Sequence, residues 1–295
     1  TKGREFGATP AVRAILLYPM NALVNDQLGR LRLLFGDPRV VDKFKTWAGR
    51  PARFARYTSR TLYPGVRDED KDKDRLQPIG KYYVQNLETA SGPASEEQQA
   101  AANLVSELKK RGKWPAKPDL TAWYGKQGTR WKDKAGGFKR CVTLPGDPEL
   151  LTRHEVHNAP PDILITNYSM LEYMLMRPLE RPVFDCTRDW LNSHPDEKLL
   201  LVIDEAHLYR GAAGAEVALL IRRLRTRLGI SPERLQVICG VDREDRRTMS
   251  SKQLHDARVV PMPTVGDEEE TVVHRQQSER FSDGSQRPGL VPAAA

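Results

Sequence analysis

Apolar residues along the chain follow two patterns, short unbroken aliphatic runs and longer segments with helical spacing. Residues 14–18 (AILLY), 162–166 (DILIT), 199–203 (LLLVI) and 235–239 (LQVIC) are runs of strand length. Helical spacing appears in 23–35, in 169–176 and in 214–228, and Gly229 is a suitable C-cap for the last of these segments. Strands and helices in this alternating order predict an α/β fold, with a parallel sheet flanked by helices.

Two stretches depart from this alternation. Residues from about 42 to 155 are rich in charge and contain one exposed helical segment that opens at Ser95, so we predict a charged insertion there. After residue 240 the apolar periodicity ends, and Phe281 is the one aromatic residue that follows. Such a segment cannot bury enough surface to offset its ordering entropy. We therefore predict that 1–240 form one domain and that 241–295 are disordered or non-native sequence.

Charge and cysteine usage narrow the class of partner and the compartment. The net charge of +8 and the pI near 9.4 favour a polyanionic partner such as nucleic acid, although a merely basic surface would give the same numbers. The three cysteines lie far apart, and His154 with His157 is expected to be a surface pair, so neither a zinc site nor a disulfide is indicated. No apolar run reaches the roughly 18 residues of a membrane span. We predict a cytoplasmic protein with no membrane partner.

An acidic turn follows the aliphatic run in LLLVIDEAH. The run would deliver Asp204 and Glu205 to the carboxyl end of a parallel strand, which is where such sheets bind ligands. There, Asp204 could hold the Mg²⁺ of a nucleotide through water, Glu205 could activate the attacking water, and His207 could relay occupancy of the site. The alternative is an ordinary turn whose carboxylates cap the next helix.

Four motifs within residues 11–239 resemble those of superfamily 2 DEAD/DEAH-box helicases, and they occur along the chain in the same order as in that family. VIDEAH resembles motif II (Walker B), YPMNALVNDQLGRL motif Ia, RYTSR the Thr-Gly element with Ser59 in place of glycine, and ITNYSMLEYMLMRP motif Ib. The strings YPMNALVNDQ and TNYSMLEYMLMRP are most similar to the large bacterial helicases of the DISARM and MrfA-like groups. This resemblance implies a RecA-like lobe of a P-loop NTPase, with ATP and Mg²⁺ as cofactors and a role in phage defence or repair.

The same resemblance implies a binding face for nucleic acid, with DNA as the expected partner and other subunits of a defence complex as further ones. The residues that match strand-contacting positions of the family are Pro19, Asn21, Ala22, Thr58 and Thr166. Simpler roles remain open for some of them. The sole role of Pro19 and Ala22 could be to end a strand and begin a helix. Thr166 and Asn167 could serve simply to cap a helix.

A phosphate-binding loop of the form G-x-x-x-x-G-K-[ST] is absent from the 295 residues, because each Gly-Lys pair is followed by Tyr, Trp or Gln. In the family this loop precedes motif Ia, and so we expect it before Thr1. The motif III triplet and a second lobe are also missing. The sequence therefore predicts an incomplete helicase lobe that is inactive alone. Two alternatives stay open, a non-catalytic nucleic-acid-binding module and a split enzyme with its other half on a second polypeptide.

Overall fold

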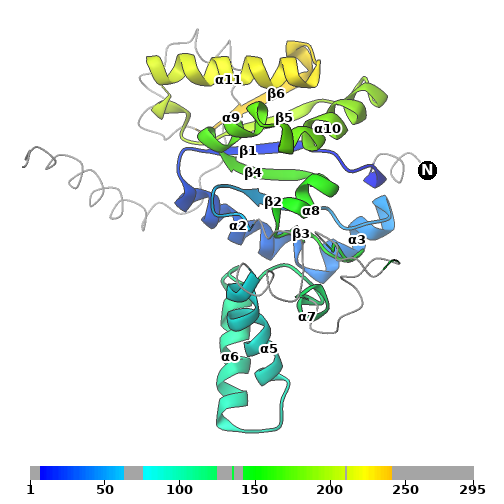
Figure 1. The fold of residues 1–295 in the computed structure, drawn as a ribbon, viewed down its shortest axis with the longest axis vertical. Helices are drawn as coiled ribbons and strands as arrows, with labels where there is room; N and C mark the ends of the chain where they lie inside the picture. Colours follow the sequence, from blue (N-terminus) through cyan, green and yellow to red (C-terminus); the bar gives the residue numbers. More distant parts are fainter. Residues whose placement is uncertain (1–6, 63–75, 125–134, 136–141, 210, 241–295) are drawn as a thin grey trace, which may run out of the picture. The chain divides into compact units, whose positions relative to one another are not determined.

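The computed structural model describes residues 7–62, 76–124, 135, 142–209 and 211–240, and the predicted tail lies outside them. Its centre is a six-stranded parallel sheet with the order β3-β2-β4-β1-β5-β6 (Figure 1). The strands are β1 (Ala14–Tyr18), β2 (Phe54–Tyr57), β3 (Glu149–Leu150), β4 (Ile163–Asn167), β5 (Leu199–Ile203) and β6 (Leu235–Cys239). The predicted α/β class with a parallel sheet is confirmed.

The strands are aliphatic because helices cover both faces of the sheet. Ile15 and Leu17 of β1 point into one buried cluster, while Leu16 and Tyr18 belong to the cluster on the other face. Strand β1 lies at the centre, and its neighbours are β4 and β5. A strand buried on two sides reads as a continuous apolar run, and that is why β1, β4 and β5 were visible in the sequence.

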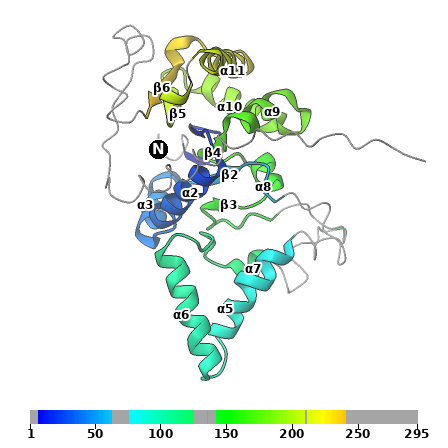
Figure 2. The same cartoon turned by 90° about the vertical axis from the view of Figure 1, so that its left-hand side faces the viewer.

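Two groups of helices form the outer layers (Figure 2). On one face lie α2 (Asn21–Phe35) and α3 (Pro38–Ala48), and on the other lie α8 (Arg153–Asn158), α9 (Tyr168–Met176), α10 (Arg181–Ser193) and α11 (Ala212–Leu228). Helix α11 ends as predicted, since the left-handed Gly229 donates its N–H to the carbonyls of Arg225 and Thr226. Within the described residues, no helix is long and apolar enough to cross a membrane.

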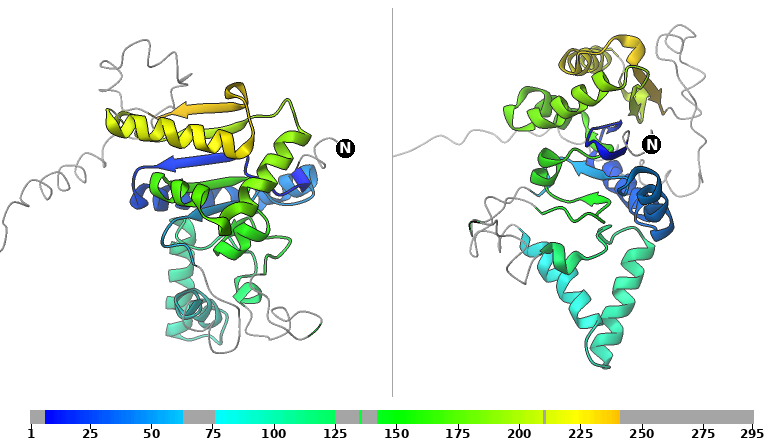
Figure 3. Two further views of the ribbon diagram at one scale, coloured as in Figure 1. Left: turned by 45° about the horizontal axis from the view of Figure 1, so that its top comes forward. Right: turned by 90° about the vertical axis from the view of Figure 1, so that its right-hand side faces the viewer.

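Residues 76–124 form an arm that lies away from the sheet (Figure 3). The arm contains the π-helical turn η1 (Ile79–Val84), α5 (Gln85–Ala90), α6 (Glu96–Lys110) and α7 (Leu120–Tyr124), and it has its own core around Trp114, Leu120 and Trp123. The Ser95 hydroxyl accepts a hydrogen bond from the Gln98 N–H at 3.0 Å, which confirms that a helix opens at Ser95. Residues 42–155 also supply β2 and β3 of the sheet, so the segment that lies outside the sheet is shorter than the predicted insertion.

Buried charges attach the arm to the sheet. The Lys117 ammonium lies 2.8 Å from Asp147 and 2.7 Å from Glu155, and all three side chains are almost inaccessible to solvent. A second clamp joins Arg32 of α2 to Glu149 of β3 at 2.7 Å, and Glu149 also accepts the Ala116 N–H at 2.7 Å. These contacts fix the base of the arm against α2 and α8.

Candidate nucleotide and nucleic-acid site

The carboxyl ends of β2, β4, β1 and β5 meet at one edge of the sheet. The register aligns Tyr57 with Thr166, Tyr18 with Asn167, and Leu17 with Ile203. Every residue predicted to contact nucleotide or nucleic acid follows or ends one of these strands. The structure therefore brings them to one edge, where parallel α/β sheets bind their ligands.

The acidic turn directly follows β5. The Asp204 N–H donates to the Leu17 carbonyl at 3.0 Å, which ties the turn to the end of β1. Glu205 has a φ of +52°, and it is the one non-glycine residue in the described chain with a left-handed backbone. Its side chain caps no helix, and α11 begins later, after Gly211. Glu205 therefore does not play the helix-capping role of the alternative interpretation.

His207 lies close to the second carboxylate. Its Nδ1 is 3.2 Å from Glu205 Oε2, and both side chains are partly buried. A histidine in this position restricts where the carboxylate can point and can donate a hydrogen bond to it when Nδ1 carries the proton. The sequence placed these two residues together, but it gave no indication of the contact between them.

Two tyrosines and a glycine lie close to Asp204. Burial raises the pKa of Tyr18 and of Tyr209, and the nearby Asp204 carboxylate raises both further. A Cβ atom on Gly240 would lie 2.6 Å from Asp204 Oδ1, so the glycine leaves room for this carboxylate. Both phenols are therefore held in their protonated form.

These groups fit a magnesium ion. Carboxylate oxygens are its preferred protein ligands, and Mg²⁺ commonly takes one or two of them and fills the rest of its shell with water and phosphate. No group of three His, Cys, Asp or Glu side chains suited to a metal occurs among the described residues. A donor set of this kind fits a Mg²⁺ ion that a nucleotide brings with it, and Asp204 is the residue that would hold the ion through water.

The predicted motif Ia residues lie at the end of β1. Pro19 is half-buried, Ala22 is exposed, and the Asn21 side chain accepts a hydrogen bond from Asn167 Nδ2 at 2.9 Å. Asn167 also caps α9 by accepting the Met170 N–H at 2.8 Å. The paired asparagines therefore join the ends of β1 and β4 at the surface of the edge.

Thr58 and Thr166 are buried, and their hydroxyls are already engaged. Thr166 Oγ1 donates to the Tyr57 carbonyl at 2.7 Å, while Thr58 Oγ1 accepts from the Arg60 N–H at 3.3 Å. The Arg153 guanidinium donates to the Thr58 carbonyl at 3.0 Å. These threonines hold neighbouring strand ends in place, and the helix cap considered for Thr166 belongs to Asn167 instead.

One further side chain at this edge was not predicted from the sequence. Arg56 of β2 donates to Asn25 Oδ1 of α2 at 2.7 Å, and it carries positive charge into the same edge. The expectation that His154 and His157 lie at the surface is wrong. His154 is buried, and the half-buried His157 has its Nε2 2.7 Å from the Tyr57 hydroxyl.

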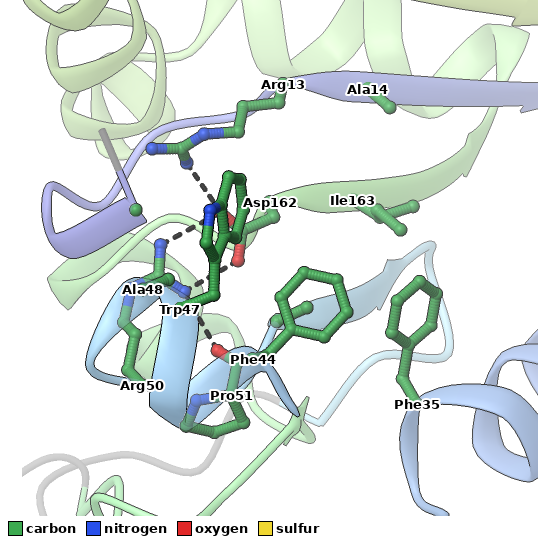
Figure 4. Close-up of a pocket in the computed structure, with 12 residues that line it drawn as sticks. Arg13, Ala14, Phe35, Phe44, Trp47, Ala48, Arg50, Pro51, Asp162 and Ile163 are labelled. Carbon is green, nitrogen blue, oxygen red and sulfur yellow. Dashed lines mark hydrogen bonds and ion pairs between the residues drawn. The ribbon is translucent and has the colours of Figure 1, made fainter. Parts of the chain in front are cut away.

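A cavity of about 200 Å³ lies at the opposite, amino edge of the sheet (Figure 4). Trp47, Phe44 and Phe35 line one part of it, and an ion cluster closes another. There the Asp162 carboxylate binds the guanidinium groups of Arg13 and Arg50. Because these charges satisfy one another, the cluster serves to join the amino ends of β1 and β4, and it is separate from the site.

The six-stranded parallel sheet with helices on both faces has the α/β arrangement of a RecA-like lobe. No family model matches the sequence. The chain is 47% identical over 241 residues to Druantia protein DruE of Escherichia coli, a match that covers 78% of this chain and 12% of DruE. It is also 31% identical over 100 residues to an uncharacterised ATP-dependent helicase of Methanocaldococcus jannaschii, which covers 34% of this chain and 13% of that protein.

The predicted relationship to helicases is therefore confirmed, and the chain spans about an eighth of the length of these two relatives. The crystal structure of the DUF1998 helicase MrfA is also similar, with 16% identity and a TM-score of 0.34 over 93% of this chain and 28% of that one.

Proposed function

We propose that this chain forms part of the first motor lobe of an ATP-dependent DNA helicase or translocase. The observation that carries the proposal is the shared edge of the sheet. The acidic turn after β5 is hydrogen-bonded to the end of β1, and the end of β1 is joined through Asn21 and Asn167 to the end of β4. A nucleotide at the acidic turn and a nucleic-acid strand at the ends of β1 and β4 would therefore contact parts of the sheet that are hydrogen-bonded to each other.

The nucleotide half of the edge rests on the acidic turn. Asp204 would hold the nucleotide's Mg²⁺ through water, and Glu205 would orient or deprotonate the water that attacks the γ-phosphate. The bound ion would neutralise charge that develops on the phosphates. Glu205 adopts a backbone conformation that costs about 1–2 kcal/mol for a residue with a Cβ, and such strain concentrates at functional sites. His207, in contact with Glu205, would report whether the nucleotide is present.

The part of the edge proposed to bind a nucleic-acid strand would contact it through surface side chains and backbone groups. Pro19, Asn21 and Ala22 lie where β1 passes into α2, and they would face the phosphates of one strand. Thr58 and Thr166 would contribute through the backbone they position, since their hydroxyls are already bonded. Contacts of this kind maintain register without reading sequence. Residues 1–240 would then act as the lobe, and the similarity to a Druantia protein supports a setting in phage defence.

Strand binding is tested by adding a charge to the exposed face of α2. Ala22→Glu should weaken binding of a fluorescent single-stranded oligonucleotide, measured by anisotropy at low salt, because the new carboxylate would repel phosphate. Ala218→Glu on the exposed face of α11 is the matched control and should bind normally. Equal binding by both variants and the parent chain would contradict a strand path along β1 and α2.

The role of Glu205 is tested in an ATP-hydrolysing protein that contains this segment joined to a phosphate-binding loop and a second lobe. Glu205→Gln keeps the size of the side chain and removes its basicity, so turnover should fall by at least about 100-fold. Unchanged turnover would refute the assignment. Salt-sensitive strand binding with no ATP hydrolysis in the reconstituted protein would instead identify a non-catalytic nucleic-acid-binding module.

A further inference from the structure

An exposed tyrosine is held rigidly at the base of the arm. Tyr82 in η1 is 46% exposed, and its ring lies edge-to-face against Tyr83 with centroids 5.0 Å apart. Tyr83 makes the same contact with the buried Trp114 at 5.2 Å, and its hydroxyl donates to the Lys113 carbonyl at 3.1 Å. The ladder of three rings orients Tyr82 before any ligand arrives, which lowers the entropy lost when a flat partner stacks on it.

Three cations lie in sequence or in space next to residues of this ladder: Lys81 precedes Tyr82, Lys113 accepts the Tyr83 hydroxyl through its carbonyl, and Arg60 lies close enough to Arg56 to lower its pKa. Arg60, Lys81 and Lys113 are exposed, and within the part of the chain that the structure describes they form no ion pair. The nearby Lys110 and Arg111, by contrast, are both paired with Glu107. Burial lowers the pKa of Arg56, and the neighbouring guanidinium groups of Arg32 and Arg60 lower it further. Arg60, Lys81 and Lys113 therefore give this part of the described chain three exposed positive charges without an ion-pair partner.

The ladder and the cations adjoin the strand half of the candidate site. Burial raises the pKa of Tyr83, and the positive charge of Arg56 is one of the influences that oppose this rise. The Arg56 side chain is also hydrogen-bonded to Asn25 of α2. The arm meets α2 so closely that a Cβ on Gly112 would lie 2.3 Å from the Gly29 carbonyl oxygen. Figures 1 and 2 show the base of the arm beside α2, the helix that follows β1 at the carboxyl edge.

We propose that Arg60, Lys81, Tyr82 and Lys113, here called the arm-base surface, bind single-stranded DNA, with a base stacked on Tyr82 and phosphates facing the three cations. A positively charged track with an aromatic platform is the usual composition of a surface that binds single strands without sequence preference. An acidic peptide would use the charges and leave the aromatic platform without a partner. This inference rests on the proposed function, because it extends the same strand beyond the sheet edge.

Stacking and phosphate contacts predict different readouts in the intact 295-residue chain. Tyr82→Ala should weaken binding of a fluorescent single-stranded oligonucleotide by about 5- to 150-fold and leave the salt dependence unchanged. Tyr82→Phe keeps the ring and should bind nearly normally. Lys81→Ala and Lys113→Ala should each reduce the slope of log affinity against log salt concentration by about 0.7. Tyr173→Ala, which removes a 55% exposed tyrosine from α9, and Lys45→Ala on α3 are the matched controls.

The outcomes separate the two levels of the proposal. If Ala22→Glu weakens binding and Tyr82→Ala does not, the arm-base surface is refuted and the strand path along α2 stands. If the parent chain shows no salt-dependent strand binding, the proposed function fails and the arm-base surface fails with it. Competition by polyglutamate as effective as competition by unlabelled oligonucleotide would also overturn the inference, because a peptide acid offers no base to stack.

Discussion

Replacement of Lys117 by methionine should destabilise the chain more than any other loss of a single charge in the arm. Lys117 is completely buried, and its ammonium contacts Asp147 at 2.8 Å and Glu155 at 2.7 Å. The same group lies 5.0 Å from the centre of the Trp123 ring. Methionine approximates the length of the side chain and its apolar stem but removes the charge, so two buried carboxylates would lose their shared cation.

The surviving hydrogen bonds set the size of the effect. Glu155 keeps donors from the Trp123 indole and from the backbone N–H groups of Leu151 and Thr152, and Asp147 keeps the Leu144 N–H. These donors help to solvate the carboxylates but do not neutralise them. Removing one partner of a buried ion pair costs about 3–5 kcal/mol. Since folded domains are stable by about 5–15 kcal/mol, the variant should lose a large fraction of its free energy of unfolding.

The loss should depend on pH in a specific direction. Burial raises the pKa of Asp147 above its ordinary value, and Lys117 is the largest influence that opposes the rise. Without the lysine, the pKa of Asp147 in the folded chain rises further. The folded variant then binds a proton more tightly than the unfolded chain, so its stability falls as pH rises through that higher pKa. The deficit should be largest at neutral pH and smaller in acid.

Urea denaturation followed by tryptophan fluorescence at neutral and acidic pH measures both effects. Lys110→Met is the control, because Lys110 is 72% exposed and its contact with Glu107 is long at 3.5 Å, and it should leave stability almost unchanged. A loss below about 1 kcal/mol for Lys117→Met, or a deficit that is equal at both pH values, would show that the buried charges are not coupled as described.

Two further predictions concern backbone space and a buried imidazole. A residue with a Cβ loses about 1–2 kcal/mol of stability in a left-handed backbone conformation. Gly112→Ala should destabilise the chain by more than that, because the new Cβ would also lie 2.3 Å from the Gly29 carbonyl oxygen. Gly49→Ala, also left-handed but with no atom within 4 Å, should show the backbone effect alone in the same urea titration, and equal losses would refute the close contact. Burial lowers the pKa of His157 from 6.5 to about 4, with His154, Arg153 and Arg177 adding to the effect, so folding stability should fall as pH drops through that interval. His157→Gln should flatten this part of the stability profile, and an unchanged profile would exclude His157 as its source.

Strands and site residues were predictable where the physical signal is local. β1, β4, β5 and β6 are short aliphatic runs, and the acidic turn follows one of them directly. β2 and β3 were missed because they are short and lie within charged sequence, so no periodicity develops. The burial of Glu149 in β3 depends on Arg32, a residue 117 positions away, and a single sequence does not show that pairing.

The same limit applies to the candidate site. Spacing alone placed Asp204, Glu205 and His207 together, yet it could not show that Asn167 bonds Asn21 across two strands or that Thr58 and Thr166 are buried. The arm-base surface gave no signal at all, because the sequence KYYV reads as an ordinary half-buried segment. Its character depends on Trp114, which reaches Tyr83 only after the arm has folded back on itself.

The order of the strands has a consequence for how the chain folds during synthesis. Among the six strands of this sheet β1 comes earliest in the sequence, both of its neighbours come later, and the earlier of them is β4, about 150 residues further along. At typical synthesis rates of 5–20 residues per second, that interval lasts about 7–30 seconds. Throughout it β1 lacks both of its neighbours in this sheet, β4 and β5, whereas the arm can pair α5 with α6 as soon as both have emerged. Nascent chains stalled before β4 should consequently be a preferred substrate for chaperones that bind extended apolar segments, with the arm already folded beside them.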